Sequence, residues 1–464
     1  MQPPLNARES QCYLDGIPKI SRQIPPANLS DMLTYRRSLQ ILALQYTTVR
    51  TRFAHGSYGG SFRHGGQGSL KTIRGVYEIS VPLIGNMANA VVNFSTHDVS
   101  LVAIVSSVIR GGKPVTGFGF NSIGRFAQPG ILRRRMIPRI LAASPEALLA
   151  EDGMFDPVAI SAVAMRDEKP GGHGDRAGAL GALELAVWDL NAKIADVPAW
   201  SWIASVTSAE VNESECNSPE VPTYAAGGYY YEDDSLGRLQ QELQRYQALG
   251  FDAFKIKIGG ADLKADMQRI DAAIDVAGSG IRVAVDANGR FEVDTALAYL
   301  EAMSDRQLRW YEEPCDPLDF DLLQQLSSVT NIPLATGENL FSAQDTRNLL
   351  RYGGLQPGRD VFQMDAGLSY GLTEYLKILE LLKTAGFSRS QCFPHGGHLI
   401  NLHIAAGLRL GGCEAYPGVF NPFGGFSPAC AYSDGKVKPS EAPGFGLEEK
   451  PELQPWLEKL REMI

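Results

Sequence analysis

The chain has 464 residues, of which 44% are hydrophobic and 20% charged, a composition typical of soluble globular proteins. Its formal net charge of −9 argues against a nucleic-acid-binding protein, since such proteins present a basic face. The sequence contains no apolar run long enough to span a bilayer, so we expect no membrane segment.

The six cysteines form no CxxC pair and show no regular spacing. Together with the absence of a recognisable secretory signal, this pattern favours free thiols in a reducing compartment, and we expect a cytoplasmic protein. A mitochondrial location is a weaker alternative, because Glu9, Asp15 and Asp31 interrupt the positive charge of the N-terminal segment.

Residues 1–70 contain scattered Pro, Arg and Ser without a helical or strand period, and we expect a poorly ordered extension. It ends in a Gly/His-rich patch, in which a metal site at His55 and His64 is a weak hypothesis based on composition alone.

Residues 71–204 indicate an α+β domain. The pattern predicts strands over Thr72–Pro82, Ser100–Ile109 and Val115–Phe120, followed by helices, notably Ala177–Ile194. The polar residues 205–220 are typical of a linker.

Beyond Val221, short apolar strands alternate with amphipathic helices, which predicts a (β/α) barrel over 221–416 and a C-terminal segment over 417–464. No G-x-G-x-x-G follows the first strand, which argues against a dinucleotide-binding fold. The predicted strand ends are Tyr224–Tyr230, Phe254–Ile258, Val283–Ala287, Trp310–Glu313, Leu334–Gly337, Val361–Asp365, Cys392–Pro394 and Glu414–Tyr416.

Three carboxylates, Asp286, Glu312 and Glu338, follow consecutive predicted strands at intervals of 26 residues. The carboxyl ends of barrel strands meet at one face, so we expect these side chains to converge. Converging carboxylates repel each other unless a cation neutralises them, and all-oxygen ligation suits Mg²⁺. Three separate surface acids are the alternative, which the matched spacing disfavours.

Lys255 and Lys257 are two residues apart on one predicted strand, so their side chains share a face. Two adjacent ammonium groups disfavour each other's charge, which lowers the pKa of one of them toward that of a useful base. A lysine-rich edge strand is the alternative, but the position one strand before Asp286 favours the catalytic interpretation.

His395 follows the seventh predicted strand in F-P-H-G-G-H, and Asp365 ends the strand before it. An Asp that orients an imidazole and raises its pKa is the usual arrangement for a histidine acid or base. We assign His398 and His403 to structural roles, because they continue into a helix.

The motifs F-K-I-K-I, V-D-A-N-G-R-F, Y-E-E-P, A-T-G-E-N and F-P-H-G-G-H together resemble the enolase superfamily, mandelate racemase subgroup, and within it most closely the D-tartrate dehydratases. The resemblance covers about residues 71–450. It implies a modified TIM barrel, (β/α)7β, with an N-terminal α+β capping domain.

The resemblance also implies residue roles. It makes Lys257 the base that removes a proton α to a carboxylate, and Lys255 the neighbour that lowers the pKa of Lys257. His395 and Asp365 form the dyad on the opposite face of the substrate. Glu414 corresponds to a carboxylic acid that hydrogen-bonds the substrate carboxylate. The implied Mg²⁺ ligands are Asp286, Glu312 and Glu338, and the weaker substrate-contact candidates are Asn288, Asn339 and Asn89.

These roles imply Mg²⁺-dependent dehydration of a small hydroxy diacid, with D-tartrate converted to oxaloacetate as the expected reaction, and a homo-oligomer is expected. Another acid-sugar dehydratase, an epimerase that uses Lys257 and His395, and a catalytically silent barrel with a binding role stay open. In the segment G-F-N-S-I-G-R-F, Ile123 replaces a polar amide of the similar proteins. This difference affects the prediction of the substrate more than the prediction of the reaction type.

The stretch E-K-P-G-G-H-G is not a phosphate loop, since its lysine precedes the glycines and no strand leads into it. The resemblance implies that Lys169 reaches the substrate as a point charge. The alternative is a helix-entry loop with a solvated lysine, and we interpret His173 as structural.

Overall fold

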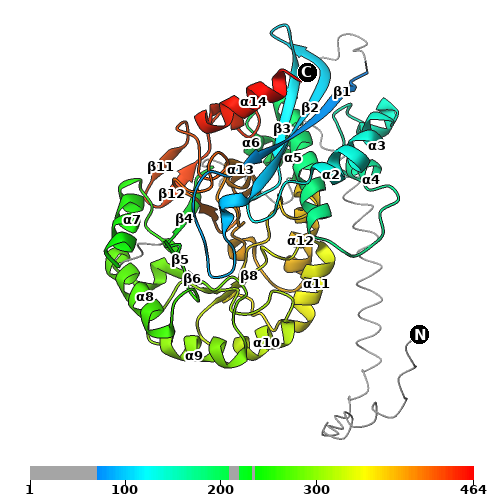
Figure 1. Ribbon diagram of the computed structural model, residues 1–464. Helices are drawn as coiled ribbons and strands as arrows, with labels where there is room; N and C mark the ends of the chain where they lie inside the picture. Colours follow the sequence, from blue (N-terminus) through cyan, green and yellow to red (C-terminus); the bar gives the residue numbers. More distant parts are fainter. Residues whose placement is uncertain (1–69, 208–218, 232–235) are drawn as a thin grey trace, which may run out of the picture. The chain divides into compact units, whose positions relative to one another are not determined.

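The computed structural model describes residues 70–207, 219–231 and 236–464, which lie in one compact unit, Tyr58–Ile464 (Figure 1). The predictions for residues 1–69, including a metal site at His55 and His64, fall outside the described residues, as does 208–218 of the predicted linker. Helix α6 (Ala199–Thr207) extends into the start of that linker.

The first domain contains an antiparallel sheet in the order β1-β2-β3 (Ile73–Pro82, Asp98–Arg110 and Lys113–Phe120), close to the predicted strands. Helix α5 (Asp175–Ala195) packs against β2 and β3. Gly117 and Gly119 of β3 permit this close approach, because a Cβ on Gly119 would lie 2.5 Å from the backbone nitrogen of Ala186.

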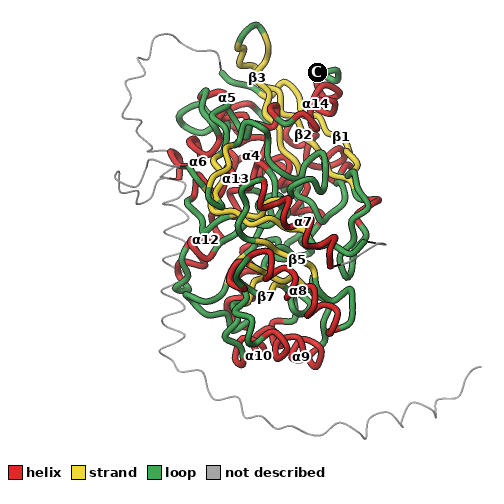
Figure 2. The backbone as a smooth tube through the Cα atoms, turned by 90° about the vertical axis from the view of Figure 1, so that its left-hand side faces the viewer, coloured by secondary structure: helices red, strands yellow, loops and turns green. Residues whose placement is uncertain are grey.

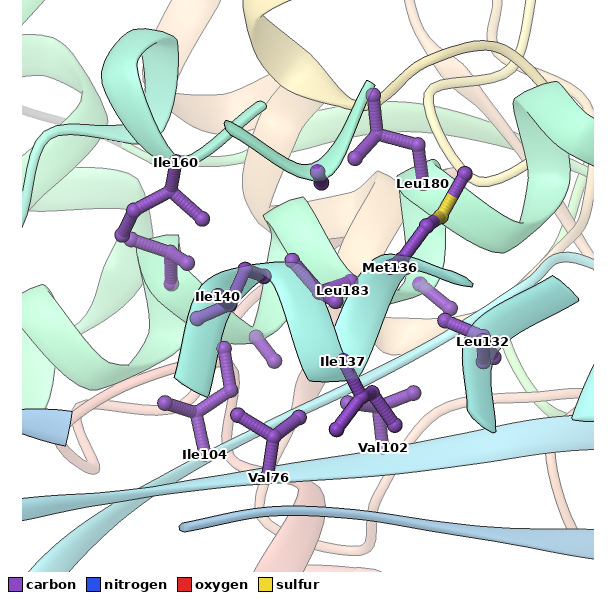
Figure 3. Packing of buried hydrophobic residues seen from close by; sticks show 14 of the residues in the cluster. Val76, Val102, Ile104, Leu132, Met136, Ile137, Ile140, Ile160, Leu180 and Leu183 are labelled. Carbon is purple, nitrogen blue, oxygen red and sulfur yellow. The ribbon is translucent and has the colours of Figure 1, made fainter. Parts of the chain in front are cut away.

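A hydrophobic core fills the space between this sheet and its helices (Figure 3). Val76 and Ile104 of the sheet contribute to it, as do Ile140, Leu180 and Leu183 of the helices. The other helical segments of the domain are η1 (Phe94–Thr96), α2 (Pro129–Ile131), η2 (Leu132–Met136), α3 (Ile137–Leu141), η3 (Pro145–Leu148) and α4 (Pro157–Ala164).

The second domain is a barrel whose strands β4 to β9 pair in parallel and in chain order, while β10 pairs with β4 and closes the ring. The strands are β4 (Val221–Gly227), β5 (Phe254–Lys257), β6 (Val283–Asp286), β7 (Tyr311–Glu312), β8 (Leu334–Thr336), β9 (Val361–Phe362) and β10 (Cys413–Ala415). The fold is therefore an α/β barrel with an N-terminal α+β domain, as predicted.

The predicted strand Cys392–Pro394 is reduced to an isolated parallel bridge between Phe362 and Cys392. Pro394 has no N–H to donate to a ladder, and Gly396 and Gly397 follow it with φ of 111° and 54°, so the extended conformation ends there.

The helices between the strands surround the barrel (Figures 1 and 2). They are α7 (Leu236–Ala248), α8 (Leu263–Ala277), α9 (Val293–Met303), α10 (Phe320–Val329), α11 (Ala343–Tyr352), α12 (Leu372–Thr384) and α13 (Leu399–Leu408), with the short η5 (Gly280–Arg282) and η6 (Arg389–Gln391). The sequence pattern predicts four of these helices, α8, α9, α11 and α12, within two residues of their observed ends, at Asp262–Val276, Thr295–Met303, Gln344–Tyr352 and Thr373–Ala385. Among the described helices, none has the length and apolar character needed to cross a membrane.

The C-terminal segment contains a hairpin, β11 (Ala431–Ser433) and β12 (Lys436–Lys438), that the sequence patterns did not predict. Strand β12 pairs antiparallel with β4. The segment then returns to the first domain through η7 (Leu447–Glu449), η8 (Pro451–Leu453) and α14 (Gln454–Arg461), which contacts β1. An ion pair of 2.6 Å joins Lys193 of α5 to Glu448.

Buried side chains of the barrel form a cluster that includes Tyr224, Ala284, Trp310, Ala335 and Val361. The charged residues Lys257, Asp286 and Glu312 are instead the last residues of their strands and lie at the carboxyl end of the barrel.

Candidate active site

The register of the barrel brings charged strand ends to one level. Lys257 pairs with Asp286 between β5 and β6, and Asp286 pairs with Glu312 between β6 and β7. Glu338 follows β8 after Gly337, whose φ is 132° and where a Cβ would lie 2.9 Å from the backbone nitrogen of Met364. A residue with a side chain would be strained there, so the backbone conformation that precedes Glu338 requires a glycine.

The three predicted carboxylates are brought together. Asp286, Glu312 and Glu338 each offer an oxygen, and these oxygens lie within 4.8 Å of one another. The first two residues are fully buried, and Glu338 is half-buried. Such a group of oxygen donors fits a hard divalent cation, with the exposed side at Glu338 left for water or substrate.

Neighbouring donors fix the orientation of Glu312. Its Oε2 accepts hydrogen bonds from Trp310 Nε1 at 2.9 Å and from Gln363 Nε2 at 2.7 Å, while its Oε1 lies 2.5 Å from the ammonium of Lys255. Burial and the charge of Asp286 together raise the pKa of Glu312 to about 8. A cation held between Asp286, Glu312 and Glu338 would favour the charged form of this carboxyl.

The two lysines of β5 lie among the carboxylates. The ammonium of Lys255 is 2.7 Å from Glu414 and 3.5 Å from Asp286, and that of Lys257 forms an ion pair with Asp286. Burial alone would lower the pKa of Lys255, but Glu312 and Glu414 outweigh it and raise the pKa well above its usual value. These carboxylates therefore favour the charged form of Lys255.

His395 and Asp365 form the expected pair, with Nδ1 of the imidazole 3.2 Å from Asp365 Oδ2. The Nε2 atom lies 3.0 Å from the hydroxyl of Tyr416 and 3.4 Å from Glu338. Burial would lower the pKa of His395, but the carboxylates of Glu338, Asp365 and Glu414 raise it to about 9. These carboxylates therefore favour the protonated imidazole, the form that can act as an acid.

Glu414 lies in β10, the last barrel strand, as expected. Its Oε2 accepts a hydrogen bond of 2.9 Å from the backbone N–H of Gly396. Burial raises its pKa, but the charge of Lys255 at 2.7 Å outweighs burial and leaves the pKa below its usual value. Lys255 therefore favours the carboxylate form of Glu414, and the expected hydrogen bond from Glu414 to a substrate carboxylate stays a prediction.

Asn288 and Asn339 both contact the carboxylates. The backbone N–H of Asn288 donates to Asp286 Oδ1 at 2.9 Å. The amide of Asn339 donates to both oxygens of Glu313, at 3.0 and 2.9 Å, and lies 3.4 Å from Glu338. Both residues therefore support the anionic cluster, whatever they contact in a substrate.

Asn89 and Lys169 are not brought to the cluster. The side-chain oxygen of Asn89 accepts hydrogen bonds from Val91 and Val92 within its own loop. Lys169 is exposed, and its backbone carbonyl accepts a hydrogen bond of 2.7 Å from Arg176. The loop of Lys169 nevertheless passes close to the barrel opening, because a Cβ on Gly174 would lie 4.0 Å from Phe341.

His173 has a structural partner, since its Nδ1 lies 2.9 Å from the hydroxyl of Tyr370. His403 is likewise structural, because its Nδ1 accepts the backbone N–H of Trp200 at 3.3 Å.

The sequence patterns placed Glu313 at a strand end but gave it no role. It is buried next to Glu312, and burial together with the charge of Glu338 raises its pKa well above the usual value. The double acid of Y-E-E-P was the available signal. The patterns missed Arg125, whose guanidinium donates to Asn339 at 2.7 Å and lies 4.9 Å from the ring of Phe341. No local pattern could have indicated this contact between distant segments.

The family follows from comparison with known proteins. Residues 238–453 match the enolase C-terminal domain-like family. The chain is 30% identical over 279 residues to 3,6-anhydro-alpha-L-galactonate cycloisomerase of Streptomyces coelicolor, an alignment that covers 60% of this chain and 70% of that protein. The chain therefore belongs to the enolase superfamily, mandelate racemase subgroup.

Two further proteins are similar. Arabinonate dehydratase of Saccharolobus solfataricus is 27% identical over 231 residues, which span 49% of this chain and only 58% of that protein. The crystal structure of L-talarate dehydratase from Polaromonas sp. JS666, complexed with Mg and L-glucarate, superposes with a TM-score of 0.67 at 23% identity. It covers 83% of this chain and 97% of that chain, and it supports the fold.

Proposed function

We propose that this protein is a Mg²⁺-dependent hydro-lyase that removes the α-proton and the β-hydroxyl of a small hydroxy acid, with D-tartrate as the expected substrate. Asp286, Glu312 and Glu338 would hold the ion, and their fit to a hard cation supports this. The bound ion would stabilise the negative charge that develops on the substrate carboxylate when the α-proton leaves.

One observation carries the proposal: two side chains that can transfer protons each contact a different carboxylate of the cluster. Lys257 forms an ion pair with Asp286, and His395 lies 3.4 Å from Glu338. A base and an acid on different sides of one cation site are what an elimination requires, because the proton and the hydroxyl leave from different carbons.

The chain's own groups suit these two tasks. Lys257, in its neutral form, would accept the α-proton. The surrounding carboxylates favour the protonated form of His395, whose Nε2 would give a proton to the departing hydroxyl, which leaves as water. The resulting enol would take a proton at the carbon that lost the hydroxyl and become a 2-keto acid, which for tartrate is oxaloacetate.

The relatives support the reaction type more than the substrate. Arabinonate dehydratase is named for loss of water from a sugar acid, and the Polaromonas structure contains a diacid. The cycloisomerase shows that the same family includes other outcomes. Epimerisation, with Lys257 and His395 acting on opposite faces of one carbon, is therefore the second candidate.

The test is a panel of acids with Mg²⁺: D-tartrate, L-tartrate, meso-tartrate, galactarate, glucarate, arabinonate and galactonate. Formation of 2-keto acid from D-tartrate alone supports the full proposal, and keto acid from another acid supports the reaction but changes the substrate. Inversion without keto acid would indicate an epimerase. No turnover of any acid, together with no Mg²⁺ binding by calorimetry, would refute the proposal that this protein is an enzyme.

The expected homo-oligomer, cytoplasmic location and substrate contacts of Lys169, Asn89, Asn288 and Asn339 stay predictions.

A further inference from the structure

A buried serine of the first domain lies beside the Asp365–His395 pair in the barrel. Ser122 follows β3, has no exposed surface, and its backbone N–H donates to the carbonyl of Gly367 at 3.1 Å. Its hydroxyl lies 2.8 Å from Nε2 of His398, which is also fully buried. Neither the cation site nor the two proton transfers explains why this polar contact is placed here.

The neighbours of His398 fix the position of its proton. His398 is the N-cap residue of α13, and its Nδ1 accepts the backbone N–H of Asn401 at 3.4 Å. Burial lowers the pKa of His398 to about 4, so the ring is neutral and carries one proton. Since Nδ1 is the acceptor, that proton is on Nε2, and it is donated to the oxygen of Ser122.

The hydroxyl proton of Ser122 is then free to be donated elsewhere. The carboxylate of Asp365, which has only acceptors, lies near the same point as this hydroxyl, and its interaction with Ser122 is among those that keep the pKa of Asp365 low despite its burial. The other oxygen of Asp365 accepts from Asn401 Nδ2 at 3.0 Å and from the N–H of Gly367 at 2.8 Å. Asp365 is thereby held from several directions.

We propose that Ser122 is a positioning residue for His395: oriented by His398, it holds Asp365 and through it the imidazole that gives up the proton. The first domain thus completes the acid side of the active site, in addition to covering the barrel. This inference rests on the proposed function for the role of His395 as the acid.

The packing around Gly396 supports this directional network. Gly396 has a φ of 111°, and a Cβ on it would lie 2.7 Å from Asp365 Oδ2 and 2.9 Å from His398 Nε2, as well as against the hydroxyl of Ser122. The atoms of three separate segments therefore converge on one point, which only a glycine leaves open.

A kinetic test of Ser122→Ala distinguishes loss of the acid step, which depends on His395, from loss of the base step, which depends on Lys257. Ser122→Ala should lower the kcat of keto acid formation from D-tartrate by about 10- to 100-fold, with KM changed less than about 3-fold. Exchange of the α-proton of D-tartrate with D2O, which depends on Lys257, should persist. Equal loss of exchange and of keto acid formation would overturn the proposal, because it would indicate general structural damage.

Two further variants sharpen the result. Ser100→Ala removes an equally buried hydroxyl of the first domain, one that donates to Glu78 at 2.7 Å, and should leave kcat unchanged. His398→Asn keeps an N-cap side chain for α13, but its shorter amide withdraws the N–H donor from Ser122, so it should reproduce the effect of Ser122→Ala. An active His398→Asn variant with normal kcat would contradict the assigned hydrogen-bond direction.

A spectroscopic measurement decides the proposal without any substrate. In the full-length, Mg²⁺-loaded protein labelled with ¹⁵N-histidine, Ser122→Ala should shift the ring nitrogen signals of both His398 and His395, and Ser100→Ala should shift neither. Unchanged His395 signals in folded Ser122→Ala would overturn the inference. An acid panel without turnover would instead refute the proposed function, while the NMR result would still show whether Ser122 positions the ring.

Discussion

The guanidinium of Arg125, in the loop after β3, donates a hydrogen bond of 2.7 Å to the side-chain oxygen of Asn339, in the loop after β8. Asn339 in turn donates to both oxygens of the buried Glu313 and lies next to Glu338 in the chain. The first domain is therefore connected to the carboxylate cluster of the barrel by one continuous series of hydrogen bonds.

Arg125→Ala should loosen this connection at the barrel opening. The loop after β3 loses both Asn339 and the ring of Phe341 as partners, so substrate affinity should fall more than the rate of the chemical step. We expect kcat/KM to fall about 10-fold, equivalent to about 1.4 kcal/mol, mainly through KM. Arg134→Ala, at an exposed arginine of η2, is the matched control. A change in kcat alone would contradict this interpretation.

Asp286→Asn should weaken Mg²⁺ binding by at least about 10-fold in calorimetric titration, because it removes one anionic oxygen donor from the cluster and leaves the other two carboxylates. Removal of Mg²⁺ from the unaltered protein with EDTA should abolish turnover, and added Mg²⁺ should restore it. Asp271→Asn, which alters an exposed acid paired with Arg306 on α8, should leave the affinity unchanged. Equal affinity in both variants would rule out Asp286 as a ligand.

Lys257→Ala should abolish keto acid formation while the protein stays folded by circular dichroism. The ammonium of Lys255 remains 3.5 Å from Asp286, so the carboxylate keeps a cationic neighbour after the change. Lys264→Ala, at an exposed lysine of α8, provides the control. Activity above about 1% of the unaltered protein in Lys257→Ala would refute its assignment as the base.

Lys169→Ala tests whether the exposed lysine of E-K-P-G-G-H-G reaches the substrate. A point charge on a substrate carboxylate predicts that KM for D-tartrate rises about 10-fold or more, while the Mg²⁺ affinity is unchanged. Lys113→Ala, at the exposed first residue of β3, is the control for loss of a surface charge. Unchanged kinetics would favour the solvated lysine that the structure places here.

The carboxylate cluster could be predicted from the sequence because each βα unit of a parallel barrel places the end of its strand at the same face of the barrel. The equal spacing of Asp286, Glu312 and Glu338 therefore translates directly into neighbouring positions in space. The helices could be predicted for a related reason, since each must bury one face against the barrel, and that requirement produces a period in the sequence.

Ionisation and contacts between distant segments could not be predicted in this way. The charge of Glu414 depends on Lys255, which is 159 positions earlier and 2.7 Å away. The bonds of Arg125 to Asn339 and of Ser122 to His398 likewise depend on how the two domains pack. The strand at Cys392 was overpredicted, because an apolar run indicates burial and does not require a full ladder of hydrogen bonds.

His403 should make the fold sensitive to acid. It is fully buried on α13, where Nδ1 accepts from Trp200 and Nε2 has no hydrogen-bond partner among the described residues. Burial lowers its pKa to about 3, below the usual value of 6.5, so the unfolded chain binds the proton more readily than the folded one between these values. Stability is therefore complete above pH 6.5 and falls as the pH decreases, by about 2 kcal/mol from this group between pH 7 and pH 5. Urea unfolding of His403→Gln at both pH values should show a loss smaller by that amount, and an equal loss in the variant and the unaltered protein would contradict the assignment.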